Sequence, residues 1–251
     1  MTDAVAVLTG VEKSYRMDAV NVPVLKGIDL LIRPGNFTVV LGPSGSGKTT
    51  MLNMIGCIDR PDKGNITVAG VDVNALSDDE LSDFRSSSIG FIFQSFNLIP
   101  VLTAFENVEY PLVLAGMPVN RRRRRVGKLL ELVGLSDRAH NLPGQLSGGQ
   151  RQRVAIARAL ARKPRLVMAD EPTANLDSET GASILALMRQ MQVQYKISFI
   201  FSSHDRSVIN AADDLIMLKD GEIRSIQRSS RAAMQSKAGC HGFPETRPPE
   251  T

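Results

Sequence analysis

Short apolar runs bounded by turn residues alternate along this chain with segments whose apolar positions recur at helical spacing. The runs that predict strands are rich in Val, Ile, Leu and Phe and lie at residues 4–16, 22–32, 36–42, 64–73, 89–94, 165–171 and 197–204. The segments that predict helices lie at residues 48–57, 77–85, 103–135 and 151–160, with a long one from about 178. This alternation predicts an α/β fold with a mainly parallel sheet.

The order of these segments predicts two lobes within one folded domain over residues 1–228. A helical block from about Leu98 to Lys163 interrupts the alternation of strands and helices, which predicts an inserted helical subdomain. Residues 229–251 are polar, contain proline and show no period, which is typical of a tail or linker.

Composition and charge limit the class of protein. No apolar run among the 251 residues approaches the roughly 20 needed to span a bilayer, so we expect neither a membrane helix nor a secretion signal. The two cysteines, Cys57 and Cys240, lie in unrelated contexts, which favours a reducing, cytoplasmic compartment. Residues 224–251 hold +3 of the formal net charge of +4. The folded part is therefore nearly neutral, and no direct nucleic-acid partner is expected.

The sequence GPSGSGKT lies directly between a predicted strand and a predicted helix and fits G-x-x-x-x-G-K-[ST]. Its glycines let backbone N–H groups turn toward phosphate oxygens, Lys48 neutralises the β- and γ-phosphates, and Thr49 offers a hydroxyl to Mg²⁺. A plain glycine turn is the alternative, which the full motif in this context disfavours. The residues expected to bind nucleotide here are Gly42, Pro43, Ser44, Gly45, Ser46, Gly47, Lys48, Thr49 and Thr50.

Two carboxylates end the predicted buried strand RLVMADE. A lone carboxylate there is costly unless it faces a cation, so Asp170 is expected to hold Mg²⁺. Glu171, one residue further on, is expected to accept a proton from an attacking water as general base. Such a strand end can also be structural, but its pairing with the phosphate loop favours a nucleotide site.

The stretch LSGGQRQRVAIARAL predicts a helix that begins beside two glycines. Ser147 is expected near the cap, because Gly148 and Gly149 weaken a helix interior while the residues after them favour one. A helix N-terminus approached by such small residues is suited to an anion.

Further motifs follow in a fixed order: Tyr15 in VEKSYR, Gln94 after IGFIF, the LSGGQ stretch, Asn175-Leu176-Asp177, and His204 in FSSHD. With the phosphate loop and the two carboxylates, they make residues 5–226 resemble the ATP-binding cassette family, the ATP-hydrolysing subunits of ABC transporters. The resemblance implies a P-loop NTPase fold with a mainly parallel core sheet, an antiparallel β subdomain and the inserted helical subdomain. It also implies ATP and Mg²⁺ as ligands.

In that family the signature helix of one subunit faces the γ-phosphate held by the phosphate loop of another. The resemblance therefore implies an ATP-dependent homodimer in which Ser147, Gly148, Gly149 and Gln150 complete the partner's site, with Asp177 nearby in the D-loop.

The same resemblance implies roles for three isolated side chains. Gln94 would contact Mg²⁺ and the attacking water, His204 the γ-phosphate, and Tyr15 the adenine ring. A lone histidine or glutamine is more often a structural or surface group, but the constellation favours the catalytic roles.

Residues 52–70 and 91–118 look most like the subgroup that powers macrolide exporters and lipoprotein-releasing complexes. This implies ATP-driven export or extraction of a lipoprotein, macrolide or peptide-like substrate through an integral membrane permease subunit. The chain would then be peripheral, on the cytoplasmic face of the inner membrane. Cell-division ATPases that signal across the membrane are an alternative. ABC ATPases of DNA repair are a second, disfavoured because they carry a long coiled-coil insertion that is missing between residues 49 and 146.

Two stretches keep alternatives open. The apolar residues from Phe96 to Val108 are a candidate surface for the membrane partner, or else they fill the core of the helical subdomain through Phe96, Leu98, Ile99 and Phe105. The run from Arg121 to Arg125 is interpreted as a solvated helix surface, with anionic lipid headgroups or a nucleic acid as alternatives. Five consecutive residues surround a helix, so we expect no single basic face there.

Overall fold

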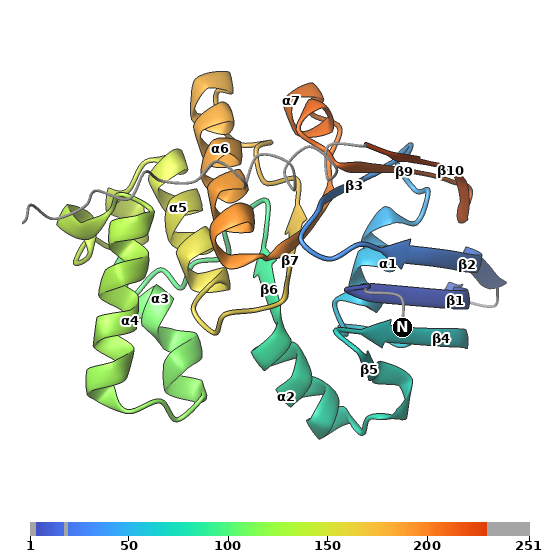
Figure 1. Ribbon diagram of the computed structural model, residues 1–251, viewed down its shortest axis with the longest axis horizontal. Helices are drawn as coiled ribbons and strands as arrows, with labels where there is room; N and C mark the ends of the chain where they lie inside the picture. Colours follow the sequence, from blue (N-terminus) through green and yellow to red (C-terminus); the bar gives the residue numbers. More distant parts are fainter. Residues whose placement is uncertain (1–3, 18–19, 230–251) are drawn as a thin grey trace, which may run out of the picture.

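A six-stranded, mainly parallel sheet forms the centre of the protein, as Figure 1 shows. The computed structural model describes residues 4–17 and 20–229. The strand order is β10-β9-β3-β8-β7-β6, and every neighbouring pair is parallel except β9 with β10. The strands are β3 (Phe37–Leu41), β6 (Ile89–Ile92), β7 (Leu166–Asp170), β8 (Ser198–Ser202), β9 (Asp214–Lys219) and β10 (Glu222–Arg228). The predicted parallel core sheet is confirmed.

A second sheet, of four antiparallel strands in the order β2-β1-β4-β5, lies beside the first. Its strands are β1 (Ala6–Met17), β2 (Val20–Ile32), β4 (Lys63–Val68) and β5 (Val71–Asp72). This is the antiparallel sheet that the family resemblance implied.

The helices divide between the two sheets and one end of the molecule (Figure 1). They are α1 (Lys48–Ile55), α2 (Asp78–Ser88), α3 (Ala104–Leu114), α4 (Val119–Leu132), α5 (Gly148–Ala159), α6 (Ser178–Tyr195) and α7 (Arg206–Asn210), with short 3-10 turns at Val73–Ala75, Ser136–Arg138 and Pro143–Gln145. The helical pattern predicted over 103–135 forms two helices, α3 and α4. Gly116, with a φ of 64°, follows α3, and Pro118 is the N-cap of α4, so a short turn joins the two helices.

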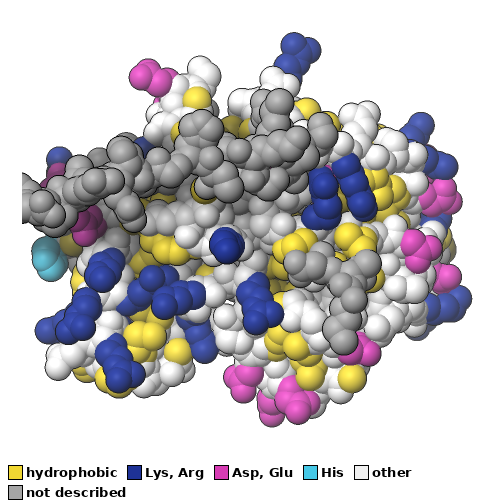
Figure 2. Space-filling model, viewed as in Figure 1, with side chains coloured by type: hydrophobic (Ala, Val, Ile, Leu, Met, Phe, Trp, Pro, Cys, Tyr) yellow, Lys and Arg dark blue, Asp and Glu magenta, His cyan; other side chains and the backbone are white. Residues whose placement is uncertain are grey.

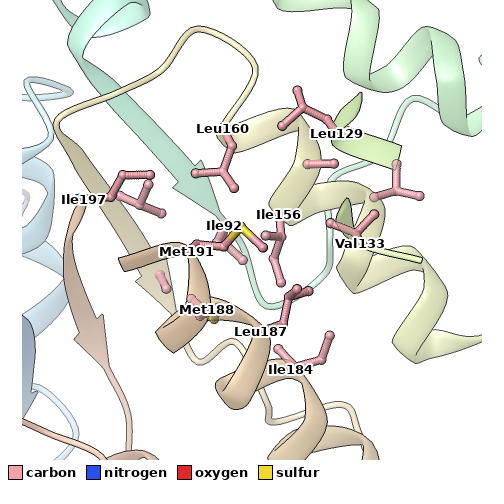
Figure 3. Close-up of a cluster of buried hydrophobic side chains, with 14 of the residues drawn as sticks. Ile92, Leu129, Val133, Ile156, Leu160, Ile184, Leu187, Met188, Met191 and Ile197 are labelled. Atoms are coloured by element: carbon pink, nitrogen blue, oxygen red, sulfur yellow. The ribbon is translucent and has the colours of Figure 1, made fainter. Parts of the chain in front are cut away.

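Alternate residues of β3 feed two separate cores, because successive side chains of a strand point to opposite faces. Phe37 and Val39 pack with α3, α4, α5 and α6, whereas Val40 packs with α1 and the antiparallel sheet. Figure 3 shows part of the first core, where residues of α4, α5 and α6 meet Ile92 of β6. Both faces of the parallel sheet are therefore covered, and the chemistry is confined to its edge.

The structure describes only some of the residues for which the tail and cysteine predictions were made. The predicted tail at 229–251 lies, except for Ser229, outside the described residues, as does Cys240. Cys57 is buried, and burial raises the pKa of its thiol to about 11. Within residues 4–17 and 20–229, no helix combines the length and apolarity that crossing a bilayer requires.

Candidate nucleotide site

The phosphate loop, residues 42–49, joins the carboxyl end of β3 to α1 and requires glycine at two positions. A Cβ on Gly42, whose φ is 154°, would lie 1.9 Å from the carbonyl oxygen of Leu218. A Cβ on Gly47, whose φ is 99°, would lie 2.9 Å from the carbonyl oxygen of Val24. The loop backbone is thus pressed against β9 and β2, with no room for side chains.

Lys48 lies beneath this loop, 9% exposed. Its Nζ donates to the carbonyl oxygens of Gly42 at 2.7 Å and of Pro43 at 2.8 Å. The Ser46 hydroxyl is also buried and has no hydrogen-bond partner among the described residues. A cation, an unpartnered hydroxyl and the first N–H groups of α1 therefore converge where an anion can bind.

Thr49 and Asp170 line one small cavity, together with apolar residues of α1 and β6. Asp170 ends β7 and is in register with Ser202 at the end of β8, so the carboxylate stands at the carboxyl edge of the sheet beside the phosphate loop. A hydroxyl and a carboxylate are the oxygen ligands that Mg²⁺ prefers, with water and phosphate completing its shell. Among the described residues no group of three or more His, Cys, Asp or Glu could hold a metal ion.

Glu171 and His204, both expected at this site from the sequence, lie close to one another. The distance from Glu171 Oε1 to His204 Nε2 is 4.0 Å. Glu171 adopts a left-handed φ of 45°, and its backbone N–H donates to the carbonyl oxygen of Ser202 at 2.9 Å, which fixes the residue just beyond the strand. The strained backbone is a feature that clusters at functional sites.

Ser203 is a member of this site that sequence reasoning missed. It is fully buried, and its hydroxyl donates to Glu171 Oε2 at 3.3 Å while accepting from the backbone N–H of Asp205 at 3.1 Å. Its only sequence signal is its position between a strand end and His204. Burial raises the pKa of Asp205, but hydrogen bonds from Ser207 and Thr173 outweigh it and lower that pKa below its usual value.

Gln94 lies two residues beyond β6 rather than at its end, and its side chain is exposed. The side-chain amide of Asn175 donates to the backbone carbonyl oxygen of Gln94 at 2.9 Å. The predicted Q-loop and D-loop residues are therefore in direct contact within one chain.

Two arginines of α5, which sequence reasoning missed, hold the turn that follows Gln94. Phe96 and Asn97 both have positive φ, 63° and 48°. Arg158 donates to both of their carbonyl oxygens, to that of Phe96 at 2.8 Å. The Arg151 guanidinium lies 5.0 Å from the centroid of the Phe96 ring. Burial lowers the pKa of Arg158.

The start of α5 is built as predicted, with Ser147 at the N-cap. The backbone N–H of Gln150 donates to Ser147 Oγ at 3.3 Å, and that of Ser147 donates to Gln150 Oε1 at 2.9 Å. Gly149 has a packing reason as well, because a Cβ there would lie 2.5 Å from Thr180 Cγ2. Ser147 is exposed, and within the described chain no hydrogen bond or ion pair joins residues 147–150 to the phosphate loop.

Asp177 has a visible structural role as the N-cap of α6. It accepts from the backbone N–H of Thr180 at 2.9 Å, and this bond lowers its pKa. Among residues 4–17 and 20–229, no hydrogen bond or ion pair joins Asp177 to the phosphate loop.

Tyr15 presents a partly exposed ring held at one end. Its hydroxyl donates to Asp59 Oδ2 at 2.9 Å, and the Lys13 ammonium lies 5.3 Å from the ring centroid. Burial, followed by the bond to Asp59, raises the pKa of Tyr15, while the Thr50 hydroxyl acts against this. The ring therefore stands next to the last predicted phosphate-loop residue, with 37% of the residue exposed.

Known proteins are similar to this chain in sequence and in fold. The sequence profile of the family described as ABC transporter matches residues 25–174. An uncharacterized ABC transporter ATP-binding protein of Thermotoga maritima is 46% identical over 221 residues, 88% of this chain and 94% of that protein. The macrolide export ATP-binding/permease protein MacB of Rhodopirellula baltica is 48% identical over 216 residues, 85% of this chain but 32% of MacB.

A solved structure is similar over nearly the whole described fold. It is the dimeric post-hydrolysis state of the ATP-binding cassette MJ0796 bound to ADP and Pi, with a TM-score of 0.81 and 44% sequence identity. The match covers 89% of this chain and 98% of that chain.

Proposed function

This chain belongs to the ATP-binding cassette family of ABC transporters, and from that premise we propose that it binds and hydrolyses ATP as a transporter's nucleotide-binding subunit. The observation that carries the proposal is the placement of Glu171 and His204, in mutual reach, at the same sheet edge as Asp170 and the phosphate loop. Relatives named for macrolide export and pyoverdine export support an export role. Extraction, and a lipoprotein or peptide-like substrate, are proposed from the subgroup resemblance.

The phosphate loop binds the triphosphate. Backbone N–H groups of residues 45–49 and the ammonium of Lys48 donate to phosphate oxygens, and Lys48 exchanges the carbonyls of Gly42 and Pro43 for them. Tyr15 supports the adenine ring from β1. Mg²⁺, when bound with the nucleotide, neutralises developing charge on the phosphates. Thr49 and Asp170 are the residues that hold it, with Gln94 as a third oxygen donor.

Glu171 acts as the general base. Its left-handed backbone turns the carboxylate out of the strand, and the Ser203 hydroxyl occupies one of its oxygens, leaving the other toward His204. The free oxygen accepts a proton from the attacking water. His204 donates to the γ-phosphate and stabilises its charge.

The second half of the site comes from another copy of the chain. Ser147 is exposed at the start of α5, where a helix N-terminus attracts an anion. We propose that Ser147 to Gln150 and Asp177 of one copy meet the nucleotide of the other. The dimeric ADP- and Pi-bound relative supports this arrangement.

The membrane subunit docks in a groove between α2 and α3. The groove is lined by Phe84 on one wall, by Tyr110 and Leu114 on the other, and by Arg162. A neighbouring pocket contains Asn97, which belongs to the turn after Gln94, and Arg158, which donates to that turn. A membrane subunit seated in the groove therefore lies close to the turn that follows Gln94. Such docking makes the protein peripheral, on the cytoplasmic face of the membrane.

This assignment moves the docking surface away from the one expected from sequence. Phe96 and Val108 are buried, and Leu98 and Phe105 pack against the helical core, so these four side chains contribute to the interior. Within this stretch Val101 is exposed, and further exposed apolar side chains lie in the second half of α3. We retain residues 98–163 as the helical subdomain that carries this surface.

Glu171→Gln is the experiment that tests the hydrolytic function. The variant keeps the shape of the side chain but is not a base, so we expect ATP binding to persist, turnover to fall by at least 100-fold, and an ATP-bound dimer to accumulate on size-exclusion chromatography. Glu131→Gln, a solvent-exposed change on α4, is the control and should behave as wild type. Normal turnover by Glu171→Gln would remove the base from the proposal.

Ser147→Arg tests the dimer. The exposed arginine blocks a partner's phosphate, so turnover is expected to be lost while nucleotide affinity of the monomer is kept. Ser77→Arg, at the equivalent cap of α2, removes the same kind of cap and should leave turnover intact. A parallel loss of monomer affinity in Ser147→Arg would place the serine in its own chain's site.

A further inference from the structure

The five arginines at the start of α4 do not share one environment. Arg122 Nε donates to Glu109 Oε1 at 2.7 Å, and its Nη1 donates to the carbonyl oxygen of Met117 at 3.1 Å. Arg125 donates to the carbonyl oxygens of Leu160 at 3.0 Å and Ala161 at 3.3 Å, the end of α5. Two of the five are therefore structural, inward-facing groups.

Arg121 to Arg125 do not form one basic face, as expected, but two of the remaining arginines form a stripe with Lys128. Arg121, Arg124 and Lys128 are spaced by three and four residues, which places them within about 60° on a helix. All three are exposed, and none forms an ion pair or hydrogen bond with a described residue. Arg123, also exposed, points about 100° or more away from them. The stripe ends one turn later at Glu131.

Exposed apolar side chains lie at the end of this stripe. Val113 and Leu114, at the end of α3, are 45% and 70% exposed. Val119, at the start of α4 on the side of Arg123, is 47% exposed. Long side chains on a helix lean toward its N-terminus, so Arg121 and Arg124 lean toward the same turn. Figure 2 shows basic side chains gathered over the part of the surface where Figure 1 places α3 and α4. Apolar groups rimmed by cations match the interface of an anionic membrane.

We propose that the α3–α4 turn and the basic stripe of Arg121, Arg124 and Lys128 contact the anionic phospholipid headgroups of the membrane. The proposed function supplies only the orientation, because Leu114 also lines the groove assigned to the membrane subunit. The turn and α2 point to the same end of the molecule (Figure 1).

The apolar side chains favour a membrane over a nucleic acid, and the charges of α2 limit the area of contact. The three apolar side chains offer no hydrogen bonds to a nucleic-acid backbone, but they can enter the headgroup layer. Across the groove, α2 carries exposed carboxylates at Asp79 and Asp83, which an anionic surface repels. The contact is therefore local to the α4 side, and weak and reversible without the membrane subunit.

Vesicle binding by the purified chain tests the proposal without ATP or any membrane protein. Vesicles of phosphatidylglycerol and phosphatidylcholine in equal parts should bind the chain at low salt, and phosphatidylcholine alone should not. Arg121→Glu with Arg124→Glu should weaken binding roughly 30-fold or more, since each basic residue near an anionic surface contributes about fivefold. Leu114→Ser should weaken it by a few fold at every salt concentration.

The matched control is Arg123→Glu with Lys219→Glu, which makes the same change of net charge away from the stripe. Its binding should stay within a few fold of wild type. Equal loss in both double variants, no binding of wild type to the anionic vesicles, or tighter binding to duplex DNA or RNA than to vesicles would each overturn the proposal. If the ATPase experiments contradict the proposed function but the chain binds vesicles as expected, only the proposed function is overturned.

Discussion

The two glycine-flanked helix starts, at α1 and α5, have opposite surroundings. The loop before α1 is pressed against β9 and β2, and Lys48 is enclosed beneath it. The start of α5 is exposed, and its polar groups are satisfied by its own Ser147 and Gln150. Both present N–H groups to an anion, but only the first has the cation and the enclosure within the same chain.

The difference teaches that an anion site can be complete or half built while its local sequence is equally glycine-rich. At α1 the glycines are required by neighbouring backbone, so changes there should damage the single chain. At α5 the requirement comes partly from packing on α6 and, in the proposed dimer, partly from a second copy. Substitutions at the two helix starts should therefore separate stability from turnover.

Gly42→Ala should have the largest effect. Its Cβ meets the Leu218 carbonyl oxygen at 1.9 Å and its φ is 154°, so the backbone of the loop or of β9 must move. We expect a loss of about 3 kcal/mol in the free energy of unfolding and at least a tenfold loss of ATP affinity. Urea unfolding and binding of a fluorescent ATP analogue measure the two.

Gly35→Ala is the control for this comparison. It also has a positive φ, 65°, but open space around the new Cβ, so only the backbone strain of about 1 kcal/mol is expected, with normal ATP affinity. If Gly42→Ala were as mild as Gly35→Ala, the crowding of the phosphate loop would not be what demands glycine.

Ser147→Ala should have the next largest effect, and on turnover rather than stability. The same capping box occurs at Ser77 with Glu80 on α2 and at Thr103 with Glu106 on α3. Alanine at any of the three caps should lower the free energy of unfolding by about 1 kcal/mol. ATP turnover by the purified protein should fall several-fold in Ser147→Ala alone. Equal turnover in all three variants would reduce Ser147 to a helix cap.

The parts of this site that sequence could predict are those fixed by local backbone requirements. Gly42, Lys48 and Asp170 follow from a strand end and a glycine loop, and the structure brings them to one edge of the sheet. The start of α5 at Ser147 was predictable for the same reason, because a cap is a property of four neighbouring residues.

The remainder depends on contacts between distant segments. Arg158 donates to the turn at Phe96 and Asn97, about sixty residues away in sequence, and the sequence near neither segment predicts this contact. The inward turn of Arg125 depends on where α5 ends. The break between α3 and α4, by contrast, is a local signal, since Gly116 and Pro118 mark it.

Gly149→Ala and Gly148→Ala should give smaller effects, the first on the free energy of unfolding and the second on turnover. A Cβ on Gly149 lies 2.5 Å from Thr180 Cγ2, a side-chain tip that can shift, so we expect a loss of about 1 to 2 kcal/mol. Adding Thr180→Ala should restore most of it in a double-mutant cycle measured by urea unfolding. A Cβ on Gly148 meets only ordinary contacts from 3.4 Å, so Gly148→Ala should keep stability and lower turnover.

The smallest expected effect is a pH dependence of stability, which differs among the three helix caps because only two of them contain a carboxylate. The backbone and hydroxyl hydrogen bonds of Ser77 and Thr103 lower the pKa of Glu80 and Glu106 below the ordinary value of 4.5, whereas Gln150 does not titrate. A lowered folded-state pKa means that the two carboxylates stabilise the fold above pH 4.5 and lose that contribution as the pH falls below it. Urea unfolding from pH 7 to pH 3 should show wild type losing its small advantage over Glu80→Gln with Glu106→Gln.

Gln150→Glu turns this titration into a test of the α5 site. It gives α5 the same carboxylate box as α2 and α3, so as a helix cap it should be at least as stable as wild type at pH 7 and acquire the same loss on acidification. If the exposed α5 start receives a partner's phosphate, however, the added negative charge repels it, and turnover should fall while stability rises. Unchanged turnover in Gln150→Glu would mean that no anion approaches this helix, because a helix start that binds phosphate cannot be indifferent to a carboxylate placed on it.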